Sequence, residues 1–149
     1  MIKTKNKLSK HLFGILFMIV FGLNTHLTFG QKATKWEAPA SANALKNPYK
    51  GDAASLVDGK TLFVSTCAVC HGETGKGNGA ASVTLSPHPA NFLSIDVEDE
   101  SDGAIFWKLT EGNPPMASYK TLLTDEQRWK LVTYIRNLEK KNKSIEKKY

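Results

Sequence analysis

The sequence predicts a small all-α domain, and two observations support that fold class. Apolar residues recur at helical spacing over residues 52–66, 101–111 and 124–138, and no run alternates as a half-buried strand does. Loops rich in Gly and Pro separate these segments. The length of 149 residues and the hydrophobic fraction of 41% suffice for one modest core, and they exclude a large multidomain enzyme.

The first 30 residues are typical of an export signal peptide. Four lysines precede an apolar run over residues 12–23, which is shorter than the roughly 20 residues that span a bilayer. Thr28, Phe29 and Gly30 form an acceptable small-x-small cleavage site. We therefore expect a signal peptide over residues 1–30, with an uncleaved anchor as the alternative, and a linker or wrapping arm over residues 31–48.

The first helix is expected over residues 52–66, where Leu56, Leu62 and Phe63 stand at helical spacing. Gly59 lies in its interior, where glycine lowers helix stability. We therefore expect another helix to approach closely at Gly59.

The second helix is expected from Ser101, as its N-cap, to about Glu111. Acidic residues crowd positions 96–102 just before it. Because carboxylates are favoured near a helix N-terminus, we expect a solvated loop there, with a docking patch as the alternative.

The third helix opens with a capping box formed by Thr124 and Gln127, and its apolar stripe continues to Leu138. The lysine-rich residues 140–149 follow, and we expect a frayed, solvated tail there.

The net charge of +6 is concentrated at the two ends of the chain. The first 30 residues carry four lysines and no acid, the last eleven carry a net +3, and residues 31–138 therefore carry −1. Nucleic-acid binding requires a basic surface that offsets phosphate charge. We expect no nucleic-acid partner.

The two cysteines of the chain, Cys67 and Cys70, stand three residues apart, and His71 follows directly. On a helix these three positions share one face. Two thiols can then bond the two vinyl groups at a haem edge, while the adjacent imidazole binds the iron. We interpret this motif as a covalent attachment site for one haem c.

Two other interpretations of the cysteine pair are weaker. A thioredoxin-like redox pair would follow a buried strand in a βαβ pattern, which the sequence lacks. A zinc site could use His71 as its third ligand, but structural zinc sites usually draw four ligands from two spaced pairs.

The second axial ligand of the iron has two candidates, because Met116 and His88 are the remaining methionine and histidine beyond residue 30. Met116 lies in the irregular segment 112–119, far enough beyond His71 to reach the opposite haem face. His88 lies between prolines in the nearer loop, where a surface position is expected. We predict ligation by Met116, and a hydrogen bond from His71 to the carbonyl of Pro87 or Pro89.

Five segments in order resemble class I c-type cytochromes, and the likeness is greatest to single-haem cytochromes of bacterial respiratory chains. They cover residues 67–79, 85–92, 102–107, 112–119 and 128–138. The resemblance implies a cytochrome c haem domain over residues 49–139, a small haem-centred fold of three main helices with a methionine loop. One departure is Ala117, because the family often has Pro directly after the axial methionine.

The function that the resemblance implies is that of an electron carrier and not of an enzyme. Haem c would be bound by Cys67, Cys70, His71 and Met116, and with both axial positions filled no small-molecule substrate is expected. The implied partners are redox proteins of a respiratory chain in the periplasm, with a membrane oxidase complex as one candidate. The alternatives are a haem enzyme or gas sensor with an open sixth position, and a haem subunit held in an oxidase or quinol-oxidising complex.

Overall fold

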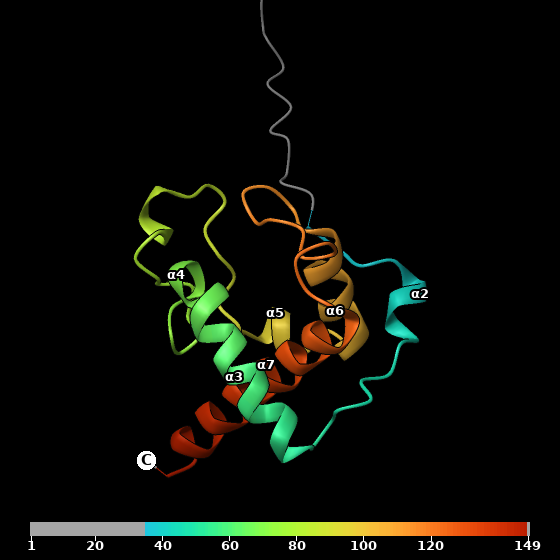
Figure 1. Cartoon of the computed structure of the whole chain (residues 1–149). Helices are drawn as coiled ribbons and strands as arrows, with labels where there is room; N and C mark the ends of the chain where they lie inside the picture. Colours follow the sequence, from blue (N-terminus) through green and yellow to red (C-terminus); the bar gives the residue numbers. More distant parts are fainter. Residues whose placement is uncertain (1–34, 149) are drawn as a thin grey trace, which may run out of the picture. The chain divides into compact units, whose positions relative to one another are not determined.

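A computed structural model describes residues 35–148, which form helices joined by loops (Figure 1). The predicted all-α fold is confirmed, because an isolated bridge is the one β-type pairing in this part of the chain. The expected signal peptide, residues 31–34 of the arm and Tyr149 lie outside the described residues. The elements are α2 (Ala40–Asn43), α3 (Ala53–Thr66), α4 (Ala68–His71), η1 (Ser82–Thr84), α5 (Ile95–Glu98), α6 (Asp102–Glu111) and α7 (Asp125–Glu146).

The crossing of α3 and α7 is the main helix-to-helix contact of the domain (Figure 1). A Cβ atom on Gly59 would lie 2.1 Å from the carbonyl oxygen of Lys130 and 3.1 Å from the Cβ of Tyr134. Lys130 also pairs with Asp58 across the crossing at 2.8 Å. The expected close approach of another helix at Gly59 is thus confirmed.

The core fills the space between α3, α6 and α7. Its most deeply buried side chains come from α3 and α7: Phe63, Leu131, Val132 and Ile135. The Phe63 ring lies 5.2 Å from that of Tyr134, a spacing at which aromatic pairs attract one another beyond their area of contact. The apolar stripe predicted for the third helix is therefore the face that α7 buries.

The predicted helix starts are confirmed. Ser101 caps α6 by accepting the Ala104 N–H at 3.0 Å. Thr124 and Gln127 form the predicted capping box, in which each side chain accepts the other residue's backbone N–H. These contacts satisfy donors that a helix N-terminus otherwise leaves unpaired.

Two expectations about the charged segments are wrong in part. The tail is exposed as expected, but it is not frayed from residue 140, because α7 continues to Glu146. Of the acidic residues before α6, Glu98 and Asp102 are half-buried in ion pairs rather than solvated, whereas Asp96 and Asp99 are exposed. Asp102 binds Arg136 at 2.8 Å, and Glu98 binds Lys143 at 2.7 Å. Basic side chains of α7 therefore attach this segment to the domain.

Residues 36–52 lead into α3 and lie against the other helices. The short α2 packs on α6, and the Asn47 side chain donates to the Thr133 hydroxyl of α7 at 3.0 Å. None of the helices between residues 35 and 148 combines the length and apolar character needed to cross a membrane.

Replacing Gly59 tests the crossing. Gly59→Ala should lower the free energy of unfolding by about 2 to 4 kcal/mol, because the new methyl group overlaps backbone that cannot move aside, and this outweighs a gain of about 1 kcal/mol in helix propensity. Denaturant unfolding followed by circular dichroism measures the change. The control is Gly51→Ala, where a Cβ meets nothing within 4 Å and only the positive φ of +85° is strained, at about 1 kcal/mol. Equal losses at the two positions would contradict the tight crossing.

Candidate functional site

The cysteine motif lies where α3 ends and the single turn of α4 follows. Cys67 closes α3, and its carbonyl oxygen accepts the N–H groups of Cys70 at 3.2 Å and of His71 at 2.9 Å. The expected helical placement of the three residues is confirmed, so their side chains leave the same side of one turn. The two cysteines do not form a disulfide with each other.

The His71 ring is fixed in one tautomer. Its Nδ1–H donates to the carbonyl oxygen of Ala90 at 3.0 Å, because a carbonyl can only accept. The prediction that Pro87 or Pro89 is the acceptor is wrong, because Ala90, the residue after Pro89, accepts instead. The ring also stacks on Phe92 with centroids 4.4 Å apart. Burial lowers the pKa of His71, against the opposite effect of the Ala90 hydrogen bond, so the neutral ring keeps a lone pair on Nε2.

A glycine in the loop after His71 explains how Ala90 comes so close. Gly77 has φ +76°, and a Cβ there would lie 2.4 Å from the Pro89 carbonyl oxygen. Its N–H donates to the His71 carbonyl at 2.8 Å. Because only glycine fits, Pro89 and Ala90 can lie close to Gly77, which brings the Ala90 carbonyl to the imidazole.

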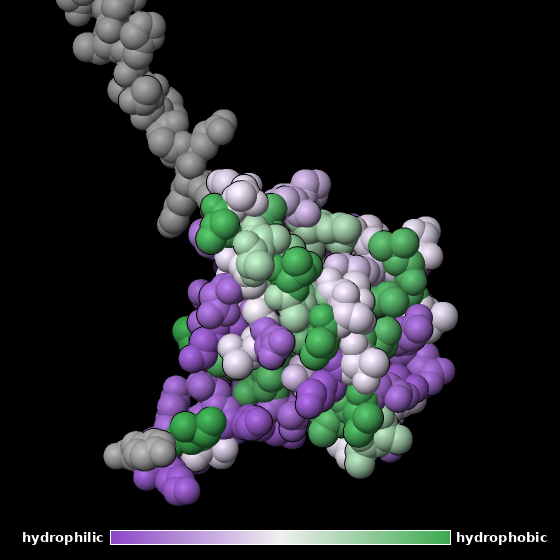
Figure 2. Space-filling model, turned by 60° about the vertical axis from the view of Figure 1, so that its left-hand side comes forward, coloured by the Kyte–Doolittle hydropathy of each residue, from purple (hydrophilic) through white to green (hydrophobic). Residues whose placement is uncertain are grey.

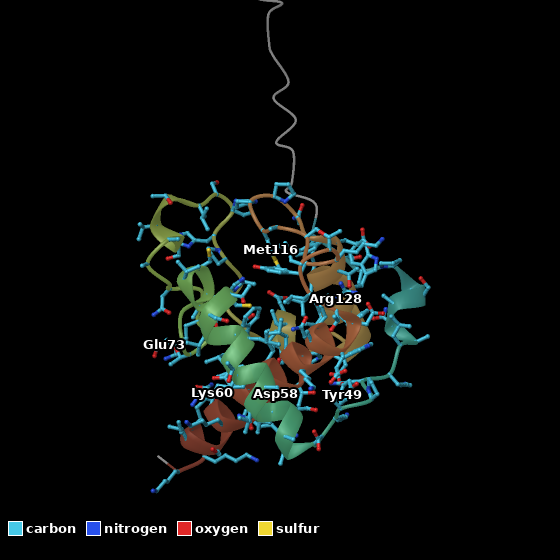
Figure 3. All side chains as sticks on the ribbon, viewed as in Figure 1. Tyr49, Asp58, Lys60, Glu73, Met116 and Arg128 are labelled. Carbon is cyan, nitrogen blue, oxygen red and sulfur yellow. The ribbon has the colours of Figure 1, made fainter. Side chains whose placement is uncertain are left out.

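The Met116 loop forms a tight backbone turn. Met116 and Asn113 exchange backbone hydrogen bonds of 2.9 and 3.0 Å. The side chain of Met116 is half-buried and packs against the core cluster that contains Cys67, and Figure 3 shows it directed from the loop toward the interior. His88 is exposed. Met116 therefore packs against the same core as Cys67, whereas His88 is exposed to solvent.

Tyr119 is a site residue that the sequence did not single out. Burial raises the pKa of its phenol, and the neighbouring Cys67 and Cys70 raise it further, so the phenol lies within electrostatic range of both thiols. Its backbone N–H donates to the Leu109 carbonyl of α6 at 3.0 Å. The one signal in the sequence is an aromatic residue three positions after Met116.

Arg128 holds the segment that follows Met116. It is 4% exposed, and its Nη1 donates to three backbone carbonyls. These belong to Tyr119 at 3.2 Å, Lys120 at 3.1 Å and Leu123 at 2.9 Å. The guanidinium lies 5.2 Å from the centre of the Phe106 ring, which itself stacks on Trp129 at 4.0 Å. Sequence reasoning included Arg128 only as part of a resembling segment.

The chemistry of the donor set fits a covalently attached haem better than the other two interpretations. Burial, together with the nearby Cys70, raises the pKa of the Cys67 thiol to about 12, so it is not the activated thiolate of a redox pair. Within residues 35–148 no three His, Cys, Asp or Glu side chains converge as a metal site. The site instead offers two thiols on one turn, one oriented imidazole and a thioether.

Comparisons with known proteins agree with this geometry. Residues 56–139 match the family model described as cytochrome c. A cytochrome c6 of Rippkaea orientalis (strain PCC 8801 / RF-1) is 36% identical over 87 residues, which cover 57% of this chain and 69% of that protein. A chain of the Kuenenia stuttgartiensis reducing HAO-like protein complex shares the fold, with a TM-score of 0.55 at 24% identity. That match covers 64% of this chain and 48% of the other.

Arg128→Gln should lower the free energy of unfolding by about 2 to 4 kcal/mol, because three carbonyls lose a charged donor in a buried place. It should also accelerate amide hydrogen exchange over residues 112–123. The matched control is Arg136→Gln, since Arg136 donates to the carbonyls of Val97 and Glu98 instead. That variant should accelerate exchange over residues 97–102 and leave the Met116 loop protected. Equal exchange in the two loops for both variants would contradict the local role of Arg128.

Proposed function

The chain belongs to the cytochrome c family and carries covalently bound haem c, and we propose that it transfers single electrons with His71 and Met116 as the two axial ligands of the iron. The observation that carries the proposal is the hydrogen bond from His71 Nδ1 to Ala90. It commits one ring nitrogen as a donor and leaves Nε2 as the ligand atom.

Cys67 and Cys70 would form the two thioether bonds. Each thiol would add across one vinyl group, with its sulfur bonded to one vinyl carbon and its hydrogen to the other, so that the step needs no oxidant or reductant. The bonds tether the group next to His71, which therefore binds the iron at high effective concentration. Covalent attachment also suits a small domain, whose own core alone gives limited stability.

Met116 is the better candidate for the opposite side of the iron. Its thioether points into the interior and its loop is held by Tyr119 and Arg128, whereas His88 is exposed. A thioether has no proton to gain, while an imidazole ligand can be protonated and lost. Compared with a second histidine, methionine raises the reduction potential of a haem.

A haem with two protein ligands supplies reversible one-electron chemistry and has no open position for a substrate. The residues around it then bind and orient the group and exclude water. We therefore propose a carrier and not an enzyme, in keeping with the similarity to a cytochrome c6. Its partners would be redox proteins of a respiratory chain, reached in the periplasm after export directed by residues 1–30.

The attachment residues are tested by haem staining after denaturing electrophoresis. Wild type should keep its stain and the double variant Cys67→Ala/Cys70→Ala should lose it, because denaturation breaks the axial bonds and only a thioether bond can then hold the group, whereas each single variant keeps stain through its remaining thioether. Val69→Ala is the control, since Val69 lies between the cysteines and is exposed. A wild-type chain that loses its haem under these conditions would contradict covalent attachment.

The axial ligand is tested by exchanging Met116. Met116→His should stay six-coordinate and lower the reduction potential by on the order of 100 mV, because the ferrous state loses its thioether ligand. Met116→Ala should open the position, so that reduced protein binds carbon monoxide with a large spectral change. His88→Ala is the control and should resemble wild type. Loss of the low-spin spectrum in the His88 variant alone would instead indicate bis-histidine ligation.

A further inference from the structure

The imidazole of His71 has an aromatic ring against its face. The centroids of the His71 and Phe92 rings lie 4.4 Å apart, and the two ring planes differ by 15°. The hydrogen bond to Ala90 holds the same imidazole at its edge, through Nδ1. Because one hydrogen bond restricts the tilt of a ring only weakly, the stacked phenyl ring is needed to fix the imidazole plane.

Phe92 is itself held firmly in this position. Its side chain is buried, its backbone N–H donates to the Gly75 carbonyl at 2.8 Å, and its ring meets the Phe63 ring edge-on with centroids 6.0 Å apart. A Cβ atom on Gly75 would lie 3.2 Å from Cδ2 of Phe92 and 3.0 Å from Cδ1 of Leu138. This close packing leaves the phenyl ring little room to move away from the imidazole.

The contacts that act on the imidazole within residues 35–148 are uncharged. Burial and the Ala90 carbonyl shift the pKa of His71, and no charged side chain adds to these two causes. Figure 2 shows hydrophilic side chains gathered mainly over the lower part of the domain, whereas the loops of the site rise at its upper end in Figure 1. The electron density of the ring is therefore set by the Ala90 carbonyl at its edge and by Phe92 at its face.

The phenyl face has a defined electrostatic effect on a ligand imidazole. The face of an aromatic ring carries partial negative charge. An imidazole bound to ferric iron is more positive than one bound to ferrous iron, because the metal withdraws electrons from its ligand. Phe92 should therefore stabilise the ferric state, as an aromatic face stabilises other positive groups. This effect opposes the higher potential that a methionine ligand confers.

We propose that Phe92 is a positioning residue of the haem site, which fixes the plane of the His71 imidazole and lowers the reduction potential through its ring face. The proposal rests on the function proposed above, because it requires His71 as an axial ligand.

Two replacements of Phe92 in the holoprotein separate the electrostatics of the ring from its packing. Phe92→Leu removes the phenyl face and keeps an apolar side chain, so it should raise the equilibrium constant for reduction about threefold. Replacement of Phe92 by pentafluorophenylalanine nearly keeps the shape and reverses the charge on the ring face, so it should raise the constant about fivefold. Spectroelectrochemical titration at fixed pH and ionic strength measures the constant. The fluorinated variant fills the same space, which keeps the test valid if Phe92→Leu folds poorly.

The matched control is Phe63→Leu, since Phe63 is fully buried in the same core and meets the edge of Phe92. It should change the equilibrium constant less than about 1.5-fold, because the stack on His71 stays in place. Electron paramagnetic resonance of the ferric protein supplies a second measurement, since the largest g value depends on the plane of the axial imidazole. That value should shift in Phe92→Leu and stay unchanged in Phe63→Leu.

Equal shifts of the constant in the two leucine variants would overturn the role of Phe92, and so would a fluorinated variant with the wild-type constant. An unchanged g value in Phe92→Leu would overturn its role in fixing the imidazole plane. A wild type without a reversible one-electron titration and a low-spin ferric spectrum would instead overturn the proposed function itself, whatever the variants do.

Discussion

The crossing of α3 and α7 at Gly59 is the constraint on which the site depends. The missing side chain lets the two backbones touch, with the Lys130 carbonyl where a Cβ would stand. Because α3 ends at Cys67, the angle and depth of this crossing set where the cysteine motif begins. The same helix α7 carries Arg128, which holds the loop after Met116. The contact at Gly59 therefore sets the position of the cysteine motif relative to the Met116 loop.

Buried side chains that donate to backbone carbonyls then fix the positions of His71 and of the Met116 loop. His71 donates to Ala90, and Arg128 donates to three carbonyls beyond Met116. In both cases a side chain from a rigid element orders a loop that has little secondary structure of its own. A charged donor suits the Met116 loop, since hydrogen bonds from ionised groups are about twice as strong as neutral ones.

The sequence predicted the features that depend on neighbours within a few positions. Helix starts at Ser101 and Thr124 follow from local capping, and the shared face of Cys67, Cys70 and His71 follows from the helical repeat. The acceptor of His71 could not be assigned, because the register of residues 87–90 is set by packing against Gly77. The helical tail was missed for the same reason, since Lys143 is held by Glu98, a residue distant in sequence.

The sequence pattern did not predict the ion pairs. Their positions show which part of the domain is held together by charged side chains. Arg136, Lys143 and Lys130 bind acidic partners on the α7 side of the domain, where they join segments distant in sequence. Apart from the buried Arg128, the loops around the haem site are joined by backbone hydrogen bonds and apolar packing instead. In the proposed function, an electron transferred there would change the charge of the haem by one unit. Charged side chains on those loops would have to reorganise with each transfer, whereas hydrogen-bonded backbone and proline-rich loops hold their dipoles nearly fixed.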